Sequence, residues 1–257
     1  MNDSDQALAR RVVGLLDLTS LNDDDDEARI NALCYRALTP LGPVAAVCVY
    51  PRFVAQARRT LNALGITSVK VATVCNFPGG TDPLVDVLSQ TAQALADGAD
   101  EIDVVYPYRA LLAGDAESGR ELIAACKAIC PPGTLLKVIL ETGELTPALI
   151  RQASFDAIAS GADFIKTSTG KVRINATTEA VKEMLVVLAQ TDRPVGLKPS
   201  GGMKVLHDAA AYLWMVERLL GPARTTSRHL RFGASSLLDS ILTQVGIYTV
   251  KANAGAY

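Results

Sequence analysis

The chain contains few of the residues that bind metals or form disulfides. Its 257 residues include two histidines and five cysteines. The cysteines are odd in number and lack the short paired spacing of zinc sites. Only Cys126 and Cys130, on one expected helix, could share an ion, and neither histidine lies near a close pair of cysteines. We therefore interpret all five cysteines as free thiols in a reducing compartment and predict no metal site.

The sequence also lacks an excess of positive charge and a long apolar run. Lysine and arginine number 25 against 27 aspartates and glutamates, which gives a net charge of −2. No basic cluster alternates with aromatic residues, so we expect no nucleic-acid partner. No apolar, uncharged stretch reaches the roughly 18 residues of a membrane span, and residues 1–21 contain no apolar signal segment. We expect a cytoplasmic protein without membrane contact.

The composition that remains is that of an ordinary globular protein. Hydrophobic residues make up 49% and charged residues 20% of the chain, which excludes disordered and fibrous classes. The length suits one large domain or two small ones. No linker or low-complexity tract divides the chain, so we predict a single domain over residues 1–257, with a flexible tail at about 246–257.

Short apolar runs alternate with longer amphipathic segments along the chain, which is typical of repeated βα units. The expected strands are 15–19, 44–49, 69–74, 101–105, 135–140, 163–168, 195–198 and 230–233. The expected helices are 26–38, 51–64, 83–97, 115–129, 146–160, 177–190, 204–220 and 235–245. Eight βα units in about 250 residues predict an α/β fold of one TIM (β/α)8 barrel.

Acidic residues at 23–27 precede one of these helices. The run has neither the turn glycine nor the closing glutamate of a calcium loop. Carboxylates are favourable at the positive end of a helix dipole and at the N-cap. The run therefore predicts a capped helix start.

Ionisable residues interrupt five of the eight expected strands. Side chains alternate along a strand, and in a barrel the aliphatic face packs on the helices while the other face points inward. The residues that this rule directs inward include Asp17, Thr19, Cys48, Asp103, Lys137, Glu141, Lys166 and Lys198. An isolated buried charge is costly, so the cluster needs an explanation.

Two explanations are open for these charges. They could form a satisfied ion network that only supports packing, or lie at the wet rim of the barrel. Buried ion networks can often be replaced by apolar groups without loss of stability, which favours a functional role. That role is clearest for Asp103, Lys166 and Lys198, whereas Asp17 and Lys137 could simply orient or neutralise the others.

The two lysines on neighbouring strands suggest a chemistry. Strands lie about 5 Å apart, and both like charge and burial disfavour the ammonium form. One lysine therefore loses its proton near neutral pH, and a neutral amine can attack a carbonyl to form a Schiff base. Asp103 could transfer protons, directly or through water. We take Lys166 as the nucleophile.

The loops after the last two expected strands suggest a phosphate site. Gly201 and Gly202 follow the seventh strand, and Ser235 and Ser236 open the last helix. TIM barrels often bind phosphate at these loops, where glycine allows close backbone approach and a helix offers free N–H groups. Charge could come from Lys171 and Lys204.

Five stretches resemble deoxyribose-phosphate aldolases, in particular a longer bacterial branch of that family. They are 17–19, 103–107, 164–170, 198–202 and 231–236. The resemblance extends over essentially the whole chain. It implies reversible cleavage of 2-deoxy-D-ribose 5-phosphate to acetaldehyde and D-glyceraldehyde 3-phosphate in deoxyribose phosphate catabolism. It further implies that no metal or organic cofactor is used and that the protein is a homodimer.

The resemblance also implies roles for individual residues. Lys166 matches the Schiff-base lysine, Lys198 the second lysine that perturbs it, and Asp103 the acid that relays protons. Tyr257 matches a C-terminal tyrosine that assists proton transfer. Thr169 is expected to support the site. The phosphate would lie on Gly170, Lys171, Gly201, Gly202, Ser235 and Ser236.

The sequence departs from the family at three places, one of which is the segment 246–256 that precedes Tyr257. Ser200 stands where alanine is frequent, and Met203-Lys204 replaces an aliphatic-arginine pair. Lysine keeps the charge but not the bidentate geometry, so we expect a weaker grip on phosphate. The alternatives are an aldolase or isomerase for another sugar phosphate, and a barrel that binds a phosphorylated ligand without catalysis. Cys48, which we expect to point inward from the second strand beside Asp17, is a further candidate, as a thiol that reacts with electrophilic aldehydes.

Overall fold

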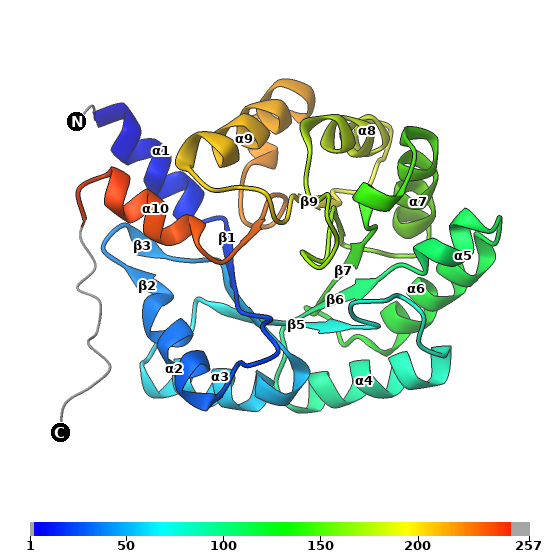
Figure 1. The fold of residues 1–257 in the computed structure, drawn as a ribbon, viewed down its shortest axis with the longest axis horizontal. Coiled ribbons are helices and arrows are strands. Elements are labelled where there is room, and N and C mark those ends of the chain that lie inside the picture. The colour runs from blue at the N-terminus through cyan, green and yellow to red at the C-terminus, as the bar shows by residue number, and fades with distance from the viewer. Residues whose placement is uncertain (1–2, 248–257) are drawn as a thin grey trace.

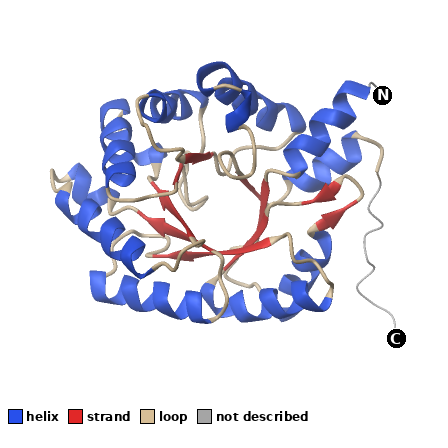
Figure 2. Cartoon of the chain, turned by 180° about the vertical axis from the view of Figure 1, so that it is seen from behind, coloured by secondary structure: helices blue, strands red, loops and turns tan. Residues whose placement is uncertain are grey.

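The computed structural model describes residues 3–247 and consists of a ring of strands surrounded by helices (Figures 1 and 2). Eight parallel strands form one sheet in the order β10-β1-β4-β5-β6-β7-β8-β9. Parallel bridges from Leu197 to Leu230 and from Ser200 to Gly233 join the two ends of this sheet. The arrangement confirms the predicted TIM barrel.

The strands and helices have the following bounds. The barrel strands are β1 (Leu16–Thr19), β4 (Ala46–Val49), β5 (Lys70–Cys75), β6 (Glu101–Val105), β7 (Leu135–Ile139), β8 (Phe164–Lys166), β9 (Gly196–Lys198) and β10 (Phe232–Ala234). A hairpin consists of β2 (Leu38–Thr39) and β3 (Gly42–Pro43). The helices are α1 (Asp3–Val13), α2 (Glu27–Arg36), α3 (Val54–Ala63), α4 (Leu84–Ala96), α5 (Tyr108–Leu112), α6 (Glu117–Ile129), α7 (Pro147–Ala159), α8 (Thr178–Ala189), α9 (Leu206–Leu220) and α10 (Leu237–Gln244). Three short 3-10 turns are Pro51–Phe53, Thr142–Glu144 and Pro222–Arg224.

All eight predicted strands and eight predicted helices are present, with strand ends within two residues of those expected. The acidic run begins α2 as predicted: the Asp26 side chain accepts a hydrogen bond of 2.8 Å from the Arg29 amide. Three elements were not predicted, namely α1, the β2–β3 hairpin and α5. Each lies outside the regular βα repeat, so the spacing that identified the other elements gives no signal for it.

Helix α1 packs beside α9 and α10 (Figure 1). It buries Ala9, Val12 and Val13 completely. In the described part of the chain, no helix has the length and apolarity to cross a membrane. The expected flexible tail lies outside the described residues from position 248 onward, and so does Tyr257.

Two kinds of core result from the alternation of side chains. Aliphatic residues such as Ile102, Val104 and Val138 are fully buried in the large cluster between strands and helices. Inside the ring, a smaller apolar cluster contains Leu21, Ala46, Cys48, Ala72 and Val74. The ring interior also holds the ring of Phe164 and a group of charged side chains, and these charged side chains form the candidate site.

Candidate active site

The pairing of neighbouring strands brings the inward-directed residues together. Lys166 of β8 is in register with Lys198 of β9 and with Ile139 of β7. Asp103 of β6 is in register with Lys137 of β7. Since paired residues in a parallel sheet point to the same side, these registers place both pairs, Lys166 with Lys198 and Asp103 with Lys137, inside the barrel.

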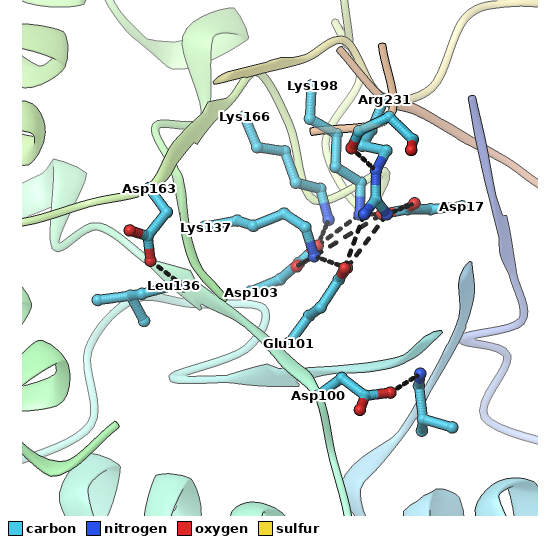
Figure 3. A network of polar contacts seen from close by, with 12 residues as sticks. Asp17, Asp100, Glu101, Asp103, Leu136, Lys137, Asp163, Lys166, Lys198 and Arg231 are labelled. Atoms are coloured by element: carbon cyan, nitrogen blue, oxygen red, sulfur yellow. Dashed lines mark hydrogen bonds and ion pairs between the residues drawn. The ribbon is translucent and has the colours of Figure 1, made fainter. Parts of the chain in front are cut away.

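The Asp103 carboxylate lies at the centre of the cluster and binds three lysines (Figure 3). Its Oδ1 accepts a hydrogen bond of 2.7 Å from Lys137 Nζ. Its Oδ2 accepts bonds of 2.8 Å from Lys166 Nζ and 2.7 Å from Lys198 Nζ. All four residues are buried. A single carboxylate therefore fixes the positions of both candidate Schiff-base lysines.

A second set of ion pairs extends this cluster toward the opposite end of the barrel. Asp17 pairs with Lys198 and accepts a hydrogen bond of 2.6 Å from Arg231. Glu101 pairs with Arg231 at 2.7 Å and with Lys137 at 2.6 Å. The alternation of side chains along the strands therefore placed Asp17 and Lys137 correctly in the interior. Their contacts fit the orienting and neutralising role considered for them.

Glu101 and Arg231 were missed as members of this network. The same alternation rule could have identified both. Glu101 lies two positions before Asp103 in one strand, and Arg231 lies two positions before the inward-facing Gly233. Arg231 was identified only as part of a family stretch, because the expected strand around it, 230–233, is too short to show a clear alternation.

The charges of the network do not balance when every group is ionised. The four cations Lys137, Lys166, Lys198 and Arg231 face the three anions Asp17, Glu101 and Asp103, an excess of one positive charge. An uncompensated charge in a buried site is costly. Loss of one proton from a lysine makes the network neutral.

The pKa shifts indicate which lysine loses the proton. Burial lowers the pKa of Lys166, and the Lys198 ammonium adds to this effect, while Asp103 opposes it. Burial alone would also lower the pKa of Lys198, but Asp103 and Asp17 outweigh it, so that pKa is raised. Burial would raise the pKa of Asp103, yet its three lysines hold it well below the ordinary value. Lys166 is therefore the lysine closest to being a neutral amine, beside an ionised Asp103.

The exposed fraction of the side chain also distinguishes Lys166 from Lys137 and Lys198. The Lys166 side chain retains 4% of its accessible surface, whereas those of Lys137 and Lys198 retain none. A ligand that enters from the carboxyl ends of the strands, where TIM barrels carry their sites, meets Lys166 first. A cavity of about 800 Å³ lies at the other end of the barrel, where Glu101 and Arg231 contribute to its lining.

Two glycines leave room for these side chains. A Cβ on Gly196 would lie 2.3 Å from the ring of Phe164, the inward residue next to it on β8. A Cβ on Gly233 would lie 2.2 Å from Ser200 Oγ and 3.3 Å from Lys198 Cε. Larger residues at either position would displace parts of the site.

Thr19 and Cys48 lie at the edge of the network. Cys48 is in register with Thr19, and Ala46, rather than Cys48, is the residue beside Asp17. This corrects the expected neighbour of Cys48 by one layer. The cysteine is fully buried, and burial raises the pKa of its thiol, which disfavours the reactive thiolate. Thr19 Oγ1 donates a hydrogen bond of 2.8 Å to the carbonyl of Asp17.

The candidate phosphate loops meet at the carboxyl end of the barrel. Gly201 N donates to the carbonyl of Gly233 at 3.1 Å, and Ala176 N donates to the carbonyl of Ser200 at 3.2 Å. These bonds join the loops that follow β8, β9 and β10. Positive φ angles of 86°, 73° and 79° occur at Gly170, Gly201 and Gly202. The exposed residues around them are Lys171, Lys204, Ser235 and Ser236.

Thr169 connects the first of these loops to the end of β7. Its side chain is buried and donates a hydrogen bond to Glu141, a residue that parity had placed on the interior line. The loop after β9 is held differently, because Asp208 accepts hydrogen bonds from the amides of Lys204 and Val205.

Comparison with known proteins adds evidence of a different kind. The family model of DeoC/LacD family aldolases matches residues 11–241. The chain belongs to this family. A candidate deoxyribose-phosphate aldolase from Toxoplasma gondii is 27% identical, with a TM-score of 0.88 over 97% of this chain and 100% of that one. One from Coccidioides immitis is 27% identical, with a TM-score of 0.80 over 92% of this chain and 87% of that one.

A deoxyribose phosphate aldolase from Aeropyrum pernix, described as tetrameric, is 21% identical, with a TM-score of 0.74 over 96% of this chain and all of its own. At this identity the likeness concerns the fold. The DeoC/LacD family member described here is an aldolase with an intact barrel and a buried lysine cluster.

Proposed function

We propose that this DeoC/LacD family aldolase is a class I enzyme that reversibly cleaves 2-deoxy-D-ribose 5-phosphate to acetaldehyde and D-glyceraldehyde 3-phosphate. The observation that carries the proposal is the pair of Lys166 and Lys198 on one Asp103 oxygen, in which only Lys166 has a lowered pKa and a side chain that keeps any accessible surface, 4% of it. The names of the Toxoplasma and Coccidioides proteins support this substrate over other sugar phosphates.

The first step is formation of the Schiff base. Neutral Lys166 Nζ attacks the aldehyde carbon of the open-chain sugar phosphate and gives a carbinolamine. The ionised Asp103 accepts a proton from the attacking amine and returns it, directly or through water, to the oxygen of the carbinolamine, and a second proton supplied by solvent lets the hydroxyl depart as water. Loss of water leaves an iminium on Lys166. Lys198 stays protonated beside it and keeps the free lysine neutral before each cycle.

Carbon–carbon cleavage follows from the iminium. A carboxylate or water removes the proton of the hydroxyl on the third carbon, and the bond between the second and third carbons breaks. Its electron pair moves to the iminium nitrogen, which gives an enamine and releases D-glyceraldehyde 3-phosphate. Protonation of the enamine carbon and hydrolysis then release acetaldehyde and regenerate Lys166. Asp103 is the group we assign to these proton transfers.

The phosphate is assigned to the three loops that meet at the carboxyl end. Backbone amides at Gly170 and Gly202 and at the start of α10 would face the phosphate oxygens, while Gly201, whose own amide donates to the Gly233 carbonyl, would allow close approach of the backbone. Lys171 and Lys204 would supply charge, with hydroxyls from Ser235 and Ser236. Because Lys204 cannot bind a phosphate with the bidentate geometry of arginine, we expect a weaker grip at this loop.

Reduction with borohydride in the presence of acetaldehyde tests the Schiff base. Trapping is expected to add one ethyl group to Lys166, located by peptide mass spectrometry, and Lys166→Met should abolish it. The matched control is Lys182→Met, which changes an exposed lysine of α8. An unmodified Lys166 in active protein would overturn the mechanism. Turnover of 2-deoxyribose 5-phosphate, compared with other sugar phosphates, tests the substrate.

We further propose that the enzyme is cytoplasmic and works as a homodimer. The family resemblance supports both proposals. Sedimentation of the purified full chain tests the assembly, and a tetramer like that described for the Aeropyrum pernix protein would overturn the dimer.

A further inference from the structure

We propose that Glu141 is a positioning residue whose buried carboxylate holds the segment from Thr169 to Lys171 in the shape that receives the substrate phosphate. The inference rests on the proposed function, which assigns Gly170 and Lys171 to the phosphate. Glu141 itself follows β7 and has no part in the lysine network.

The backbone of Glu141 has an unusual conformation for its residue type. Its φ of 57° and ψ of 55° lie in the left-handed region, which glutamate rarely adopts. Among the described residues that are not glycine, only Asn76 shares a positive φ. The pairing of β7 with β8 continues on both sides, since Leu140 N and Thr142 N donate to the carbonyls of Lys166 and Thr167 at 2.9 Å. The unfavourable conformation is therefore held in place by its surroundings.

The carboxylate of Glu141 is buried and is bound by one residue. Oε1 accepts a hydrogen bond of 3.1 Å from Thr169 N, and Oε2 accepts one of 2.6 Å from Thr169 Oγ1. No lysine or arginine of the described residues forms an ion pair with it. Burial raises the pKa of Glu141, and the hydrogen bonds from Thr169 and the charge of Lys166 oppose this shift only in part. A buried carboxylate of this kind contributes little to the free energy of unfolding, which suggests that Glu141 has another role.

The hydrogen bonds continue from Thr169 into the phosphate loop. Because the Thr169 hydroxyl donates its proton to Glu141, its oxygen is free to accept from Lys171 N at 3.0 Å. Gly170 lies between them with a φ of 86°. An ionised acceptor strengthens the first bond and fixes the direction of the hydroxyl. A glutamine side chain at position 141 could donate a hydrogen bond to Thr169 Oγ1 instead of accepting one. The direction of the Thr169 hydroxyl would then no longer be fixed.

The turn after Glu141 makes a second contact with the same loop. A Cβ on Gly143 would lie 2.0 Å from the carbonyl oxygen of Ile174, so this glycine packs directly against the later part of the β8–α8 connection. The loop is thus held at Thr169 by a carboxylate and at Ile174 by backbone contact. Both contacts come from residues 141–144, which identifies this turn as a support for the loop.

The variant Glu141→Gln tests the inference through a comparison of two substrates. We expect kcat/KM for 2-deoxyribose 5-phosphate to fall about tenfold, mainly through KM, as for loss of a bond to a charged group. With unphosphorylated 2-deoxyribose, kcat/KM should stay within about twofold. The matched control is Glu144→Gln, which removes an exposed acid of the same turn and should change neither value.

A second variant addresses folding. Glu141→Gly removes the carboxylate and relieves the positive φ, so the protein should unfold at the parent temperature or above while losing preference for the phosphorylated substrate. Equal losses with both substrates, or none, would overturn the inference.

Borohydride trapping of acetaldehyde is the separate readout for the proposed function. Failure of trapping in the parent enzyme rejects both, whereas normal trapping with an unchanged substrate preference in Glu141→Gln rejects only the role of Glu141.

Discussion

At the scale of single residues, the Asp103 carboxylate determines how the two neighbouring lysines differ. It contacts Lys166 and Lys198 through the same oxygen, so it cannot by itself favour either. The asymmetry comes from Asp17, which pairs with Lys198 and not with Lys166. Lys198 therefore keeps its proton, and its charge helps to remove the proton of Lys166. The support of Asp17 is electrostatic and acts through Lys198.

This asymmetry leads to a prediction for Lys198→Met. Removal of the Lys198 charge leaves Asp103 and Asp17 with fewer cations and takes away the repulsion on Lys166, so the pKa of Lys166 should rise. At neutral pH less Lys166 is neutral, and kcat/KM should fall by roughly 100-fold. The rising limb of the pH profile of kcat/KM should move to higher pH.

The measurement is kcat/KM for aldol cleavage across pH 5 to 10, with Lys182→Met as the control that changes an exposed lysine. A lower rate with an unmoved pH profile would contradict the electrostatic role of Lys198.

At the scale of elements, the alternation of side chains along strands explains what the sequence could predict. The eight barrel strands were found because each has aliphatic residues at every second position or as a short run. The inward charges of β6, β7, β8 and β9 followed directly from this parity. Even β8 (Phe164–Lys166), a short strand, was located, because the regular alternation of expected strands and helices on either side of it indicated its position.

The features that the sequence could not predict depend on tertiary contacts. Glu141 lies in a left-handed conformation that its residue type disfavours, and it is held there by its contact with Thr169 and by the pairing of its neighbours with β8 and the residue that follows it. Helix α5 is a single short turn inside the β6–α6 connection, without a periodic signal of its own. Ser200, which follows β9, fills the space beside Gly233 of β10. No local sequence pattern indicates a contact between residues so far apart in the chain.

Gly196 provides a prediction at this scale. It lies on β9 opposite Phe164 of β8, in the layer below the two lysines. In Gly196→Ala the new methyl group would overlap the ring of Phe164, and this overpacking should lower the free energy of unfolding by about 1–3 kcal/mol. Urea unfolding measures the change. The control is Gly14→Ala, where a Cβ would meet its nearest atoms at 3.6 Å. Equal effects of the two substitutions would show that Phe164 moves aside without cost.

At the scale of the whole molecule, the ion network joins opposite sides of the barrel. Arg231 precedes β10, and it binds Asp17 of β1 and Glu101 of β6. Lys137 and Lys198 extend the connections to β7 and β9. The bridges that close the ring are few, at Leu197 and Ser200. The network therefore contributes to closing the barrel as well as to the chemistry we propose for Lys166.

This double role predicts how stability depends on pH. Although burial would raise the pKa of Asp17, Lys198 and Arg231 lower it below its ordinary value, and the pKa of Asp103 is lowered in the same way. The unfolded chain therefore binds protons that the folded chain does not. The stabilisation should be complete above about pH 4, the unfolded range of aspartate, and should be lost as pH falls further toward the folded pKa values.

The test compares urea unfolding of the parent, Asp17→Asn and Asp192→Asn at pH 7, 5, 4 and 3. Asp192 is an exposed acid and serves as the control. Asp17→Asn should be less stable than the parent at pH 7, because Lys198 and Arg231 lose a buried anionic partner. Its free energy of unfolding should nevertheless fall less steeply below pH 4, since one fewer group takes up a proton on unfolding. Parallel slopes for the parent and Asp17→Asn would mean that Asp17 is protonated in the folded barrel, and the charge balance that leaves Lys166 neutral would then not hold.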